Sequence, residues 1–210
     1  PAHNFKNISL SEKYRLSEDI DNYDYIYSME KLALMKGKQY ESIRRFVNKF
    51  QRLYSWEVKY LDLDDKNTWE EIAALNRIWV SQKQPGNSEI QDLSTVQRFR
   101  SIYENINYFA LGIYIEGTIR GYCIIELNSM EFTNCLFIYA DTDYHGIYPF
   151  MKKQFASRLL DMGYNYLNFQ QDSGFKGLRR YKRSLRPEFY LKKFIITDSG
   201  ISITDKWAKK

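Results

Sequence analysis

The sequence predicts an α/β protein in which helices cover the faces of a mixed β-sheet. Three observations predict this class. From residue 56 onward the spacing of apolar residues switches between that of strands and that of helices, in the order β-α-α-β-β-β-α-β-α-β-β. Three strands follow one another between helices, which favours a mixed sheet over a purely parallel one. The chain contains no internal repeat and no low-complexity segment, so a repeat architecture is excluded.

Residues 1–55 are expected to form an extension that precedes the main domain. The first 25 residues are polar and are expected to be irregular. Ser28 is placed to cap a short helix over residues 29–36. Residues 38–54 follow the 3.6-residue spacing of an amphipathic helix. The outer face of that helix is basic and consists of Lys38, Arg45, Lys49 and Arg52.

Residues 56–210 are expected to form one domain around the sheet. Thr68 is expected to cap its first helix, and "EGT" at 116–118 to form the turn of a β-hairpin. The expected strands cover residues 56–63, 108–115, 119–127, 135–141, 164–171, 192–197 and 200–204. The expected helices cover residues 68–80, 96–106, 147–162 and 176–186, with a loop at 82–88.

The composition excludes several classes of protein. An apolar fraction of 44% supplies a core, so intrinsic disorder is excluded. No apolar run approaches the ~18 residues of a membrane span and no signal peptide is evident, so a cytoplasmic protein is expected. Cys123 and Cys135 lie in apolar strands and are interpreted as buried free thiols. Two cysteines and two histidines, far apart, do not have metal-site spacing, and no metal is expected.

The charge favours anionic partners. A net charge of +5 suits nucleic acid, phosphates or an anionic membrane surface. The local signal is strongest in residues 176–193, which hold eight Lys or Arg and a single acid, Glu188. Like charges at i, i+4 repel one another, so an anionic ligand would relieve the strain, although a solvated helix face is the simpler alternative. The cations that share one helical face are Lys176, Arg179, Arg180 and Arg183.

The start of this basic helix, "DSGFKG", could itself receive an anion. It offers backbone N–H groups and the positive end of a helix dipole, and Gly174 and Gly177 permit close approach. The alternative is an Asp–Gly turn in which Ser173 has a capping role.

The order of elements resembles that of the GNAT acyltransferases, in which two central parallel strands splay apart to form a cleft. Here the splaying pair would be the strands at 135–141 and 164–171. Ligands in open α/β sheets bind at the carboxyl ends of such strands. The resemblance therefore implies a site at residues 140–148 and 170–177.

Three segments also resemble the C-terminal domain of phosphatidylglycerol lysyltransferases and its stand-alone relatives. They are "YDYIYSMEKLALMKGKQYESIRRFVNKF", "YADTDYHGIYPFMKKQFA" and "NFQQDSGFKGLRRYKRSLRP". The third is the most specific, and Ser173 replaces the Leu of the family pattern. Its matching residues are Gln171, Asp172, Gly174, Gly177, Leu178, Arg179, Lys182, Ser184 and Pro187. The resemblance covers roughly residues 20–197, and family members usually carry a further half-domain upstream.

This resemblance implies transfer of an aminoacyl or acyl group from a carrier to an acceptor. In the lysyltransferases the donor is aminoacyl-tRNA and the acceptor is a lipid hydroxyl, so the donor is a substrate and no cofactor is expected. A coenzyme A-dependent GNAT has an Arg/Gln-x-x-Gly-x-Gly/Ala loop that cradles the pyrophosphate. The corresponding "DTDYHGIYPF" has only Gly146, and Pro149 lacks an N–H donor. This departure favours a bulkier carrier such as tRNA over a coenzyme A thioester.

Asp141, His145 and Tyr148 are the expected catalytic residues. They cluster where acyl transfer needs a base and stabilisation of an oxyanion. Asp141 matches the family's Ala-Asp, and imidazole titrates nearest to neutrality, although a loop histidine is often merely exposed. The expected substrate-binding residues are Asn168, Gln170, Gln171 and Asp172; for Asn168 and Gln170 the alternative is that they are polar groups satisfied within the sheet. The expected carrier-binding residues are Gly174, Lys176, Gly177, Arg179, Arg180 and Lys182.

Three functions are compatible with the sequence. The first is an aminoacyl or acyl transferase, which could also contact an anionic membrane peripherally. The second is an acetyl-CoA-dependent N-acetyltransferase on the same fold. The third is a non-catalytic module that binds anions.

Overall fold

The computed structural model of the chain describes residues 14–82, 87–129 and 131–198. Contacts group the chain into two compact units. The sheet unit comprises Tyr27–Asn168, and the terminal unit combines Pro1–Ile26 with Phe169–Lys210. The contacts thus divide the chain elsewhere than at residue 55, because the helices that precede this residue pack against the helix of residues 147–161.

The sheet unit is built on five strands in the order β3-β4-β5-β6-β7. The first three pairs are antiparallel, whereas β6 and β7 are parallel. This mixed sheet confirms the expected fold class and most of the expected order. The strands are β3 (Trp56–Tyr60), β4 (Tyr108–Ile115), β5 (Thr118–Leu127), β6 (Phe132–Ala140) and β7 (Tyr166–Asn168).

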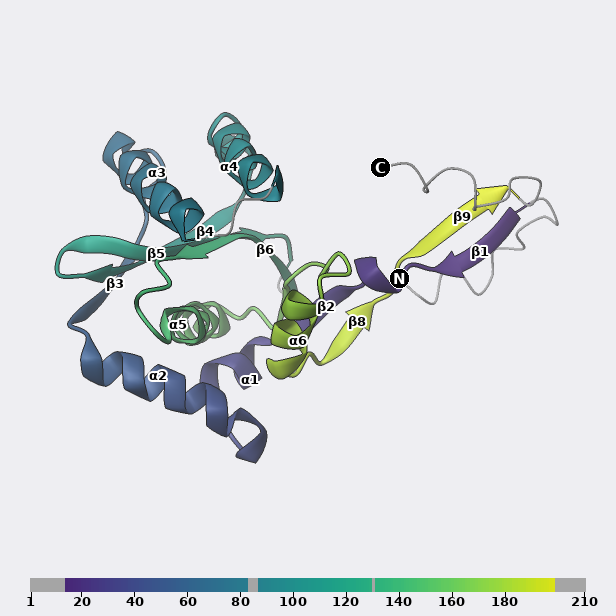
Figure 1. Cartoon of the computed structure of the whole chain (residues 1–210), viewed down its shortest axis with the longest axis horizontal. Helices are drawn as coiled ribbons and strands as arrows, with labels where there is room; N and C mark the ends of the chain where they lie inside the picture. Colours follow the sequence, from purple (N-terminus) through teal and green to yellow (C-terminus); the bar gives the residue numbers. More distant parts are fainter. Residues whose placement is uncertain (1–13, 83–86, 130, 199–210) are drawn as a thin grey trace. The chain divides into compact units, whose positions relative to one another are not determined.

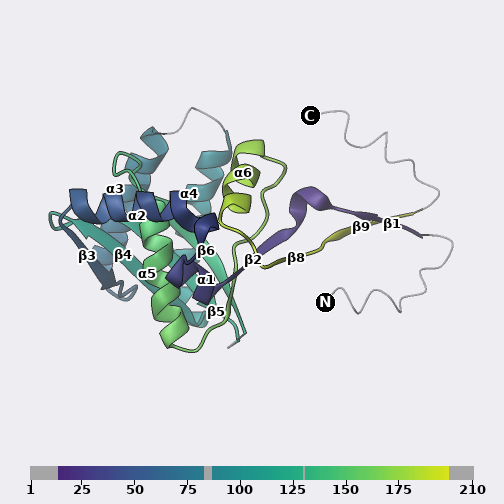
Figure 2. The same ribbon diagram turned by 90° about the horizontal axis from the view of Figure 1, so that it is seen from below.

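Helices cover both faces of these strands (Figure 1). On one face lie α3 (Lys66–Ser81) and α4 (Asn87–Arg100), whose apolar side chains pack on β5 and β6. On the other face α5 (Ile147–Asp161) buries an apolar stripe against the sheet. Both α1 (Met29–Leu34) and α2 (Glu41–Leu53) pack on α5. Figure 2 shows that α2 crosses α5. Short 3-10 turns, η3 (Lys38–Tyr40) and η4 (Tyr103–Asn105), complete this unit.

Local sequence signals explain several boundaries. The turn between β4 and β5 has positive φ at both Glu116 (52°) and Gly117 (75°), as a type I′ hairpin requires. Ser28 accepts a hydrogen bond from the Lys31 N–H and so caps α1 as expected. The cap of α3 is Asp65, whose side chain accepts from Asn67, and not Thr68, which is buried. The helix expected at 96–106 is α4, which begins and ends earlier than its apolar pattern predicted.

The terminal unit contains strands that the sequence analysis missed at its start. Residues 14–25, expected to be irregular, contain β1 (Tyr14–Glu18), η2 (Ile20–Asn22) and the start of β2 (Asp24–Ser28). All residues of β1 are exposed, so this strand lacks the apolar alternation that marks a half-buried strand. β1 pairs with β9 (Phe194–Asp198), and β2 pairs with β8 (Phe189–Leu191), both antiparallel. The basic helix α6 is confirmed at Lys176–Ser184.

Parts of three expected elements lie beyond the described residues. These are the first 13 residues of the lead-in, most of the loop at 82–88 and the strand at 200–204. No helix in the described part of the chain is long and apolar enough to cross a membrane.

Candidate active site

The strands β6 and β7 separate as they run toward their carboxyl ends. Their parallel pairing comprises Phe132↔Tyr166, Thr133↔Leu167 and Asn134↔Asn168. β7 then ends at Asn168, whereas β6 continues for six residues to Ala140. This is the splayed arrangement expected from the sequence, and it places the end of β6 and the start of α5 at the opening.

Asp141 anchors this corner of the sheet unit. The carboxylate is 4% exposed and accepts hydrogen bonds from Gln82 Nε2 at 2.6 Å and from the Asp143 N–H at 3.1 Å. Arg120 Nη1 lies 3.4 Å from its second oxygen. Three donors from three segments therefore fix one buried carboxylate. The contacts suit a positioning role better than proton transfer to a substrate, because a general base must reach the acceptor's proton.

Tyr148 lies on the first turn of α5 and is tied to both α3 and β6. Its phenol oxygen accepts the indole N–H of Trp79 at 3.1 Å and the backbone N–H of Ala140 at 3.2 Å. The Trp79 ring in turn packs against Tyr139 at a centroid distance of 4.7 Å. The phenol is half-buried, at the end of β6 where the strands have separated. Of the three expected catalytic residues, Tyr148 has the best-fixed geometry.

His145 lies on the loop between Asp141 and Tyr148 but is exposed. The described part of the chain gives its imidazole no hydrogen bond or ion pair. Nothing therefore orients this side chain as a catalytic base, and its role stays a prediction.

Arg120 is a candidate that the sequence analysis missed. It lies on β5, its side chain is 25% exposed, and its guanidinium lies 5.2 Å from the centre of the Tyr144 ring. Its Nε is buried and finds no hydrogen-bond partner within the described part of the chain. A buried donor without an acceptor is costly unless a ligand supplies one. A lone arginine in "TIRGYC" has no sequence signal; only the register of β5 against β6 brings it to Asp141.

The start of α5 is not built like a diphosphate cradle. The N–H of Ile147 already donates to the Tyr144 carbonyl at 3.1 Å, and Pro149 has no N–H. Gly146 has a φ of 92°, and a Cβ there would meet the Phe46 carbonyl of α2 at 2.4 Å. The glycine thus serves the packing of α2 on this loop. The first turn of α5 therefore has fewer unoccupied backbone N–H donors than a pyrophosphate site needs.

Lys152 is a second residue that the sequence analysis missed. It lies one turn beyond Tyr148 on α5, is 1% exposed, and its Nζ is 5.3 Å from the Tyr148 ring centre. Burial lowers the pKa of Lys152 from 10.5 to about 8. Two nearby thiols, Cys123 and Cys135, are buried and, among the described residues, form no disulfide, as expected. Lys152 falls within the apolar periodicity of its helix, so a sequence signal was available.

A second polar cluster lies in the terminal unit and centres on Asp172. This carboxylate is 1% exposed and accepts hydrogen bonds from Tyr25 Oη at 2.5 Å, Arg179 Nε at 2.8 Å and the Gly174 N–H at 2.9 Å. Arg179 also donates to Asp21 at 2.6 Å. The Arg179 guanidinium holds the pKa of Asp172 well below its usual range, and the same pairs raise the pKa of Arg179.

Lys182 was expected to bind the carrier, and the structure contradicts this. Its side chain is buried, at 5% exposed, and Nζ donates to the carbonyls of Phe169 (2.5 Å), Gln171 (2.7 Å) and Gln170 (3.2 Å). An ammonium group has three donors, and all three are occupied. Lys182 therefore fixes the segment that follows β7, where φ of Gln170 is 57°.

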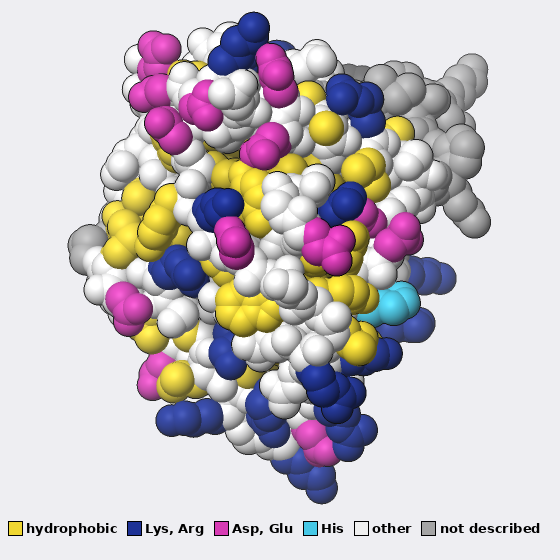
Figure 3. All heavy atoms as spheres, turned by 90° about the vertical axis from the view of Figure 1, so that its left-hand side faces the viewer, with side chains coloured by type: hydrophobic (Ala, Val, Ile, Leu, Met, Phe, Trp, Pro, Cys, Tyr) yellow, Lys and Arg dark blue, Asp and Glu magenta, His cyan; other side chains and the backbone are white. Residues whose placement is uncertain are grey.

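Two of the remaining cations of α6, Lys176 and Arg180, are available to a ligand, whereas Arg183 also forms a side-chain hydrogen bond with Tyr25. Lys176, Arg180 and Arg183 are exposed, as are Phe175 (62%), Leu178 (39%) and Tyr181 (36%). A Cβ at Gly177 would meet nothing within 4 Å. In the sheet unit, the expected basic face of α2 is exposed as well, at Lys38, Arg45, Lys49 and Arg52. Lys and Arg side chains gather over α2 in the lower part of Figure 3.

Comparison with known protein families shows which family this fold represents. The C-terminal domain of phosphatidylglycerol lysyltransferase matches residues 5–197. The chain belongs to this family. No curated protein sequence matches the chain.

Solved structures resemble this lysyltransferase-family chain in fold. A conserved protein of unknown function from Bacteroides thetaiotaomicron is 24% identical, with a TM-score of 0.78 over 93% of the chain. L-PGS from Bacillus licheniformis is 15% identical, with a TM-score of 0.66 over 96% of it. The C-terminal domain of a putative lysylphosphatidylglycerol synthetase from Agrobacterium fabrum is 12% identical, with a TM-score of 0.62 over 88% of it. The chain spans 65%, 65% and 61% of the lengths of these three structures, respectively.

The expected site of this lysyltransferase-family chain is distributed over both units. Asp141, His145, Tyr148 and Asn168 lie in the sheet unit, and the structure brings Asp141 and Tyr148 to one corner. Gln170 to Lys182 lie in the terminal unit, where Asp172, Arg179 and Lys182 serve the internal structure. Gln171 is half-buried and accepts from Lys193 at 3.3 Å. A single cleft that unites both groups stays a prediction.

Family and fold support a transferase of acyl groups, without fixing its donor or acceptor.

Proposed function

We propose that this chain transfers an aminoacyl group from aminoacyl-tRNA to a hydroxyl or amine of a lipid or small molecule. The family match supports the reaction class, since the described family is that of a lysyltransferase. The observation that carries the proposal is the corner formed by Tyr148 and Arg120 at the end of β6. The phenol, held by two N–H donors, and the guanidinium, whose Nε has no acceptor among the described residues, are both bound to the end of β6, at Ala140 and Asp141.

This corner suits the chemistry of ester aminolysis or transesterification. The acceptor oxygen or nitrogen attacks the ester carbonyl, negative charge develops on the carbonyl oxygen, and the carrier leaves as an alkoxide that needs a proton. Two N–H donors polarise the phenol oxygen of Tyr148, so its hydroxyl is suited to giving its proton to the leaving oxygen, and the phenolate then takes up the proton that the acceptor loses. Arg120 Nε would donate to the developing oxyanion. Asp141 holds Arg120 in place and balances its charge.

The start of α5 supports a donor other than a coenzyme A thioester. Its N–H of Ile147 is occupied, Pro149 has none, and Gly146 is packed against α2. A tRNA instead needs phosphate contacts spread over a surface. The exposed basic faces of α2 and α6 fit that requirement, and aromatic Phe175 and Tyr181 could stack on unpaired bases.

The direct test combines purified protein, bulk tRNA charged with radiolabelled amino acids, and anionic lipid vesicles or small amines as acceptors. Transfer of label to the acceptor is the expected result. Tyr148→Phe should reduce kcat by about 10²-fold with a smaller effect on KM, since a general acid acts in the transition state. Arg120→Gln should reduce kcat/KM by a similar factor, because one oxyanion donor is lost.

The matched controls are Tyr60→Phe and Arg98→Gln, which change an exposed tyrosine of β3 and an exposed arginine of α4. Both should retain the parent rate. Unchanged rates for Tyr148→Phe and Arg120→Gln would remove this corner from the chemistry. Label transfer from acetyl-CoA but not from charged tRNA would replace the proposal by the N-acetyltransferase alternative. Binding of tRNA without transfer to any acceptor would favour the non-catalytic module.

A further inference from the structure

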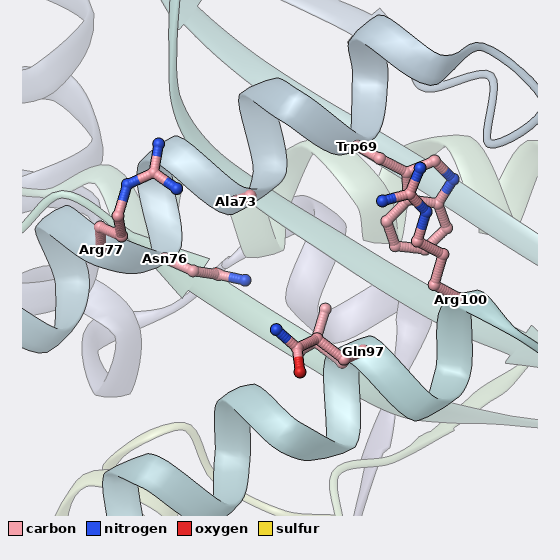
Figure 4. A pocket seen from close by; sticks show the side chains of 7 residues that line it. Trp69, Ala73, Asn76, Arg77, Gln97 and Arg100 are labelled. Carbon is pink, nitrogen blue, oxygen red and sulfur yellow. The ribbon is translucent and has the colours of Figure 1, made fainter.

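A groove between α3 and α4 lies on the face of the sheet opposite α5, outside the corner described above. The groove encloses about 330 Å³, at the lower end of the range for small-molecule sites. Figure 4 shows its lining residues. Its walls are apolar and come from Trp69 and Ala73 of α3 and Val96 of α4.

The floor of the groove holds an amide with an unused donor. Asn76 is 4% exposed, and within the described part of the chain its side chain makes one hydrogen bond, in which Oδ1 accepts from Tyr122 Oη at 3.0 Å. Its Nδ2 is thus a donor without an acceptor. Figure 4 shows the Asn76 side chain extending from α3 into the space between the two helices, with its amide nitrogen foremost. This nitrogen can therefore donate a hydrogen bond to a ligand in the groove.

Two arginines flank this donor, and neither has an acidic partner among the described residues. Arg77 lies at one end of the groove, and Arg100 lies at the other, with its guanidinium 5.4 Å from the centre of the Trp69 ring. No carboxylate pairs with either arginine in the described part of the chain. Trp69 and Arg77 are eight residues apart on α3, or about 12 Å along the helix.

The chemistry of the groove selects an anion with an apolar body. Its floor and its two ends present donors, and none of the described side chains that line it is acidic. A bare inorganic ion would leave the exposed part of the apolar lining in contact with water, and a neutral hydrocarbon would leave the Asn76 amide unsatisfied. We propose that the groove between α3 and α4 is a binding site for a small organic carboxylate, with the carboxylate on Asn76 and a guanidinium and the aryl or alkyl chain on Trp69.

Trp69 gives the test a readout that does not depend on catalysis. Protein labelled with 5-fluorotryptophan is titrated with 3-phenylpropionate and octanoate, and the ¹⁹F signal of Trp69 is assigned with Trp69→Phe. That signal should move in a saturable way. The signal of Trp56, which packs against Phe150 on the other face, should stay in place. 3-Phenylpropanamide, which has the same shape without charge, should bind about tenfold more weakly or not at all.

Four substitutions separate the site from general effects. Arg100→Gln should weaken 3-phenylpropionate by about tenfold, whereas Arg98→Gln, on the same helix but outside the groove, should change it less than about twofold. Asn76→Asp keeps the acceptor for Tyr122 and replaces the donor by a negative charge, and should abolish binding. If Asn76→Asp does not fold, Arg77→Gln tests the other end of the groove.

Four results would overturn the proposal. They are a Trp69 signal that no probe moves, equal binding of the amide and the carboxylate, an equal response to inorganic phosphate alone, and equal effects of Arg100→Gln and Arg98→Gln.

Discussion

At the scale of single residues, identical side-chain types have different uses in this molecule. Arg179 and Lys182 are tied to a buried carboxylate and to three carbonyls, whereas Arg180 and Lys176 on the same helix are exposed. Helical spacing placed several of these cations on one face. It could not tell which of them the protein itself uses, because that depends on Asp172 and on the carbonyls of 169–171.

Lys152 should make stability depend on pH in the alkaline range. Its folded pKa of about 8 lies below the unfolded value of 10.5. Between these values the unfolded chain binds a proton that the folded chain has lost, so stability rises with pH. Below pH 8 both states are protonated and the destabilisation is complete.

Lys152→Met should therefore stabilise the protein at pH 7, by about 3 kcal/mol. The variant should also lose the alkaline rise that the parent shows. Denaturant unfolding at pH 7, 9 and 10.5 measures both effects, and Lys153→Met, one residue away, is the matched control. If Lys152→Met instead destabilises the protein equally at every pH, the amine has a structural partner. The free energy gained from that partner then exceeds the free energy lost by desolvating the amine.

Asp172 should govern stability at low pH. Its folded pKa is lowered by Arg179, so the stabilisation is complete above the unfolded pKa near 4 and is lost as pH falls toward the folded value. Asp172→Asn should destabilise the protein by about 2–4 kcal/mol at pH 7, because Arg179 loses a buried partner. The loss should shrink as pH is lowered below 4. A difference from the parent that stays constant between pH 7 and pH 3 would contradict the assignment.

At the scale of elements, α2 and α5 are joined through one glycine. Gly146 combines a φ of 92° with a position directly under the Phe46 carbonyl. Two other contacts reinforce the junction, since Phe50 stacks on Phe150 at 4.6 Å and Tyr54 meets Tyr144 at 5.0 Å. The loop that carries His145 is therefore set by α2.

Gly146→Ala should destabilise the protein far more than Gly117→Ala. Both glycines have positive φ, but a Cβ at 117 meets nothing within 4 Å. The conformational cost alone is about 1 kcal/mol, whereas a steric clash with backbone at 146 should raise the loss to about 3 kcal/mol or more. Thermal unfolding of the two variants measures the difference. Equal losses of stability in the two variants would show that α2 moves away from the new Cβ at no cost in free energy.

Much of this element-level arrangement followed from sequence. Alternating apolar runs predicted β4, β5 and β6, and the Glu116-Gly117 turn predicted the hairpin that joins β4 to β5. The same signals failed where a strand is exposed on all residues, as β1 is, and where pairing is short, as in β7. The position of Tyr148 just after a strand end was predictable, but the contacts of Arg120 and Gln82 with Asp141 were not, because they arise only from folding.

At the scale of the whole molecule, the excess of positive charge should control association with tRNA. The logarithm of the binding constant should fall linearly with the logarithm of salt concentration, and the slope counts the phosphates that are neutralised. Lys49→Glu with Arg52→Glu on α2, and Arg180→Glu with Arg183→Glu on α6, should each weaken binding and flatten the slope. Fluorescence anisotropy at several salt concentrations measures both quantities.

Lys66→Glu on α3 is the control for these reversals, because it changes the net charge by the same amount per residue at a site outside both basic faces. A uniform response to all reversals would indicate a non-specific charge effect. A slope unchanged by the α2 or α6 pair would remove that face from the tRNA surface.

The burial of Lys152 also has a consequence for chemical reactivity. An amine with a pKa near 8 is in part unprotonated at neutral pH, and in that form it is a nucleophile toward activated esters. A protein that handles such esters would modify this amine if it were accessible, and its exposure of 1% is what protects it. The rate at which an activated ester acylates Lys152, measured by mass spectrometry, therefore reports how often the core between α5 and the sheet opens.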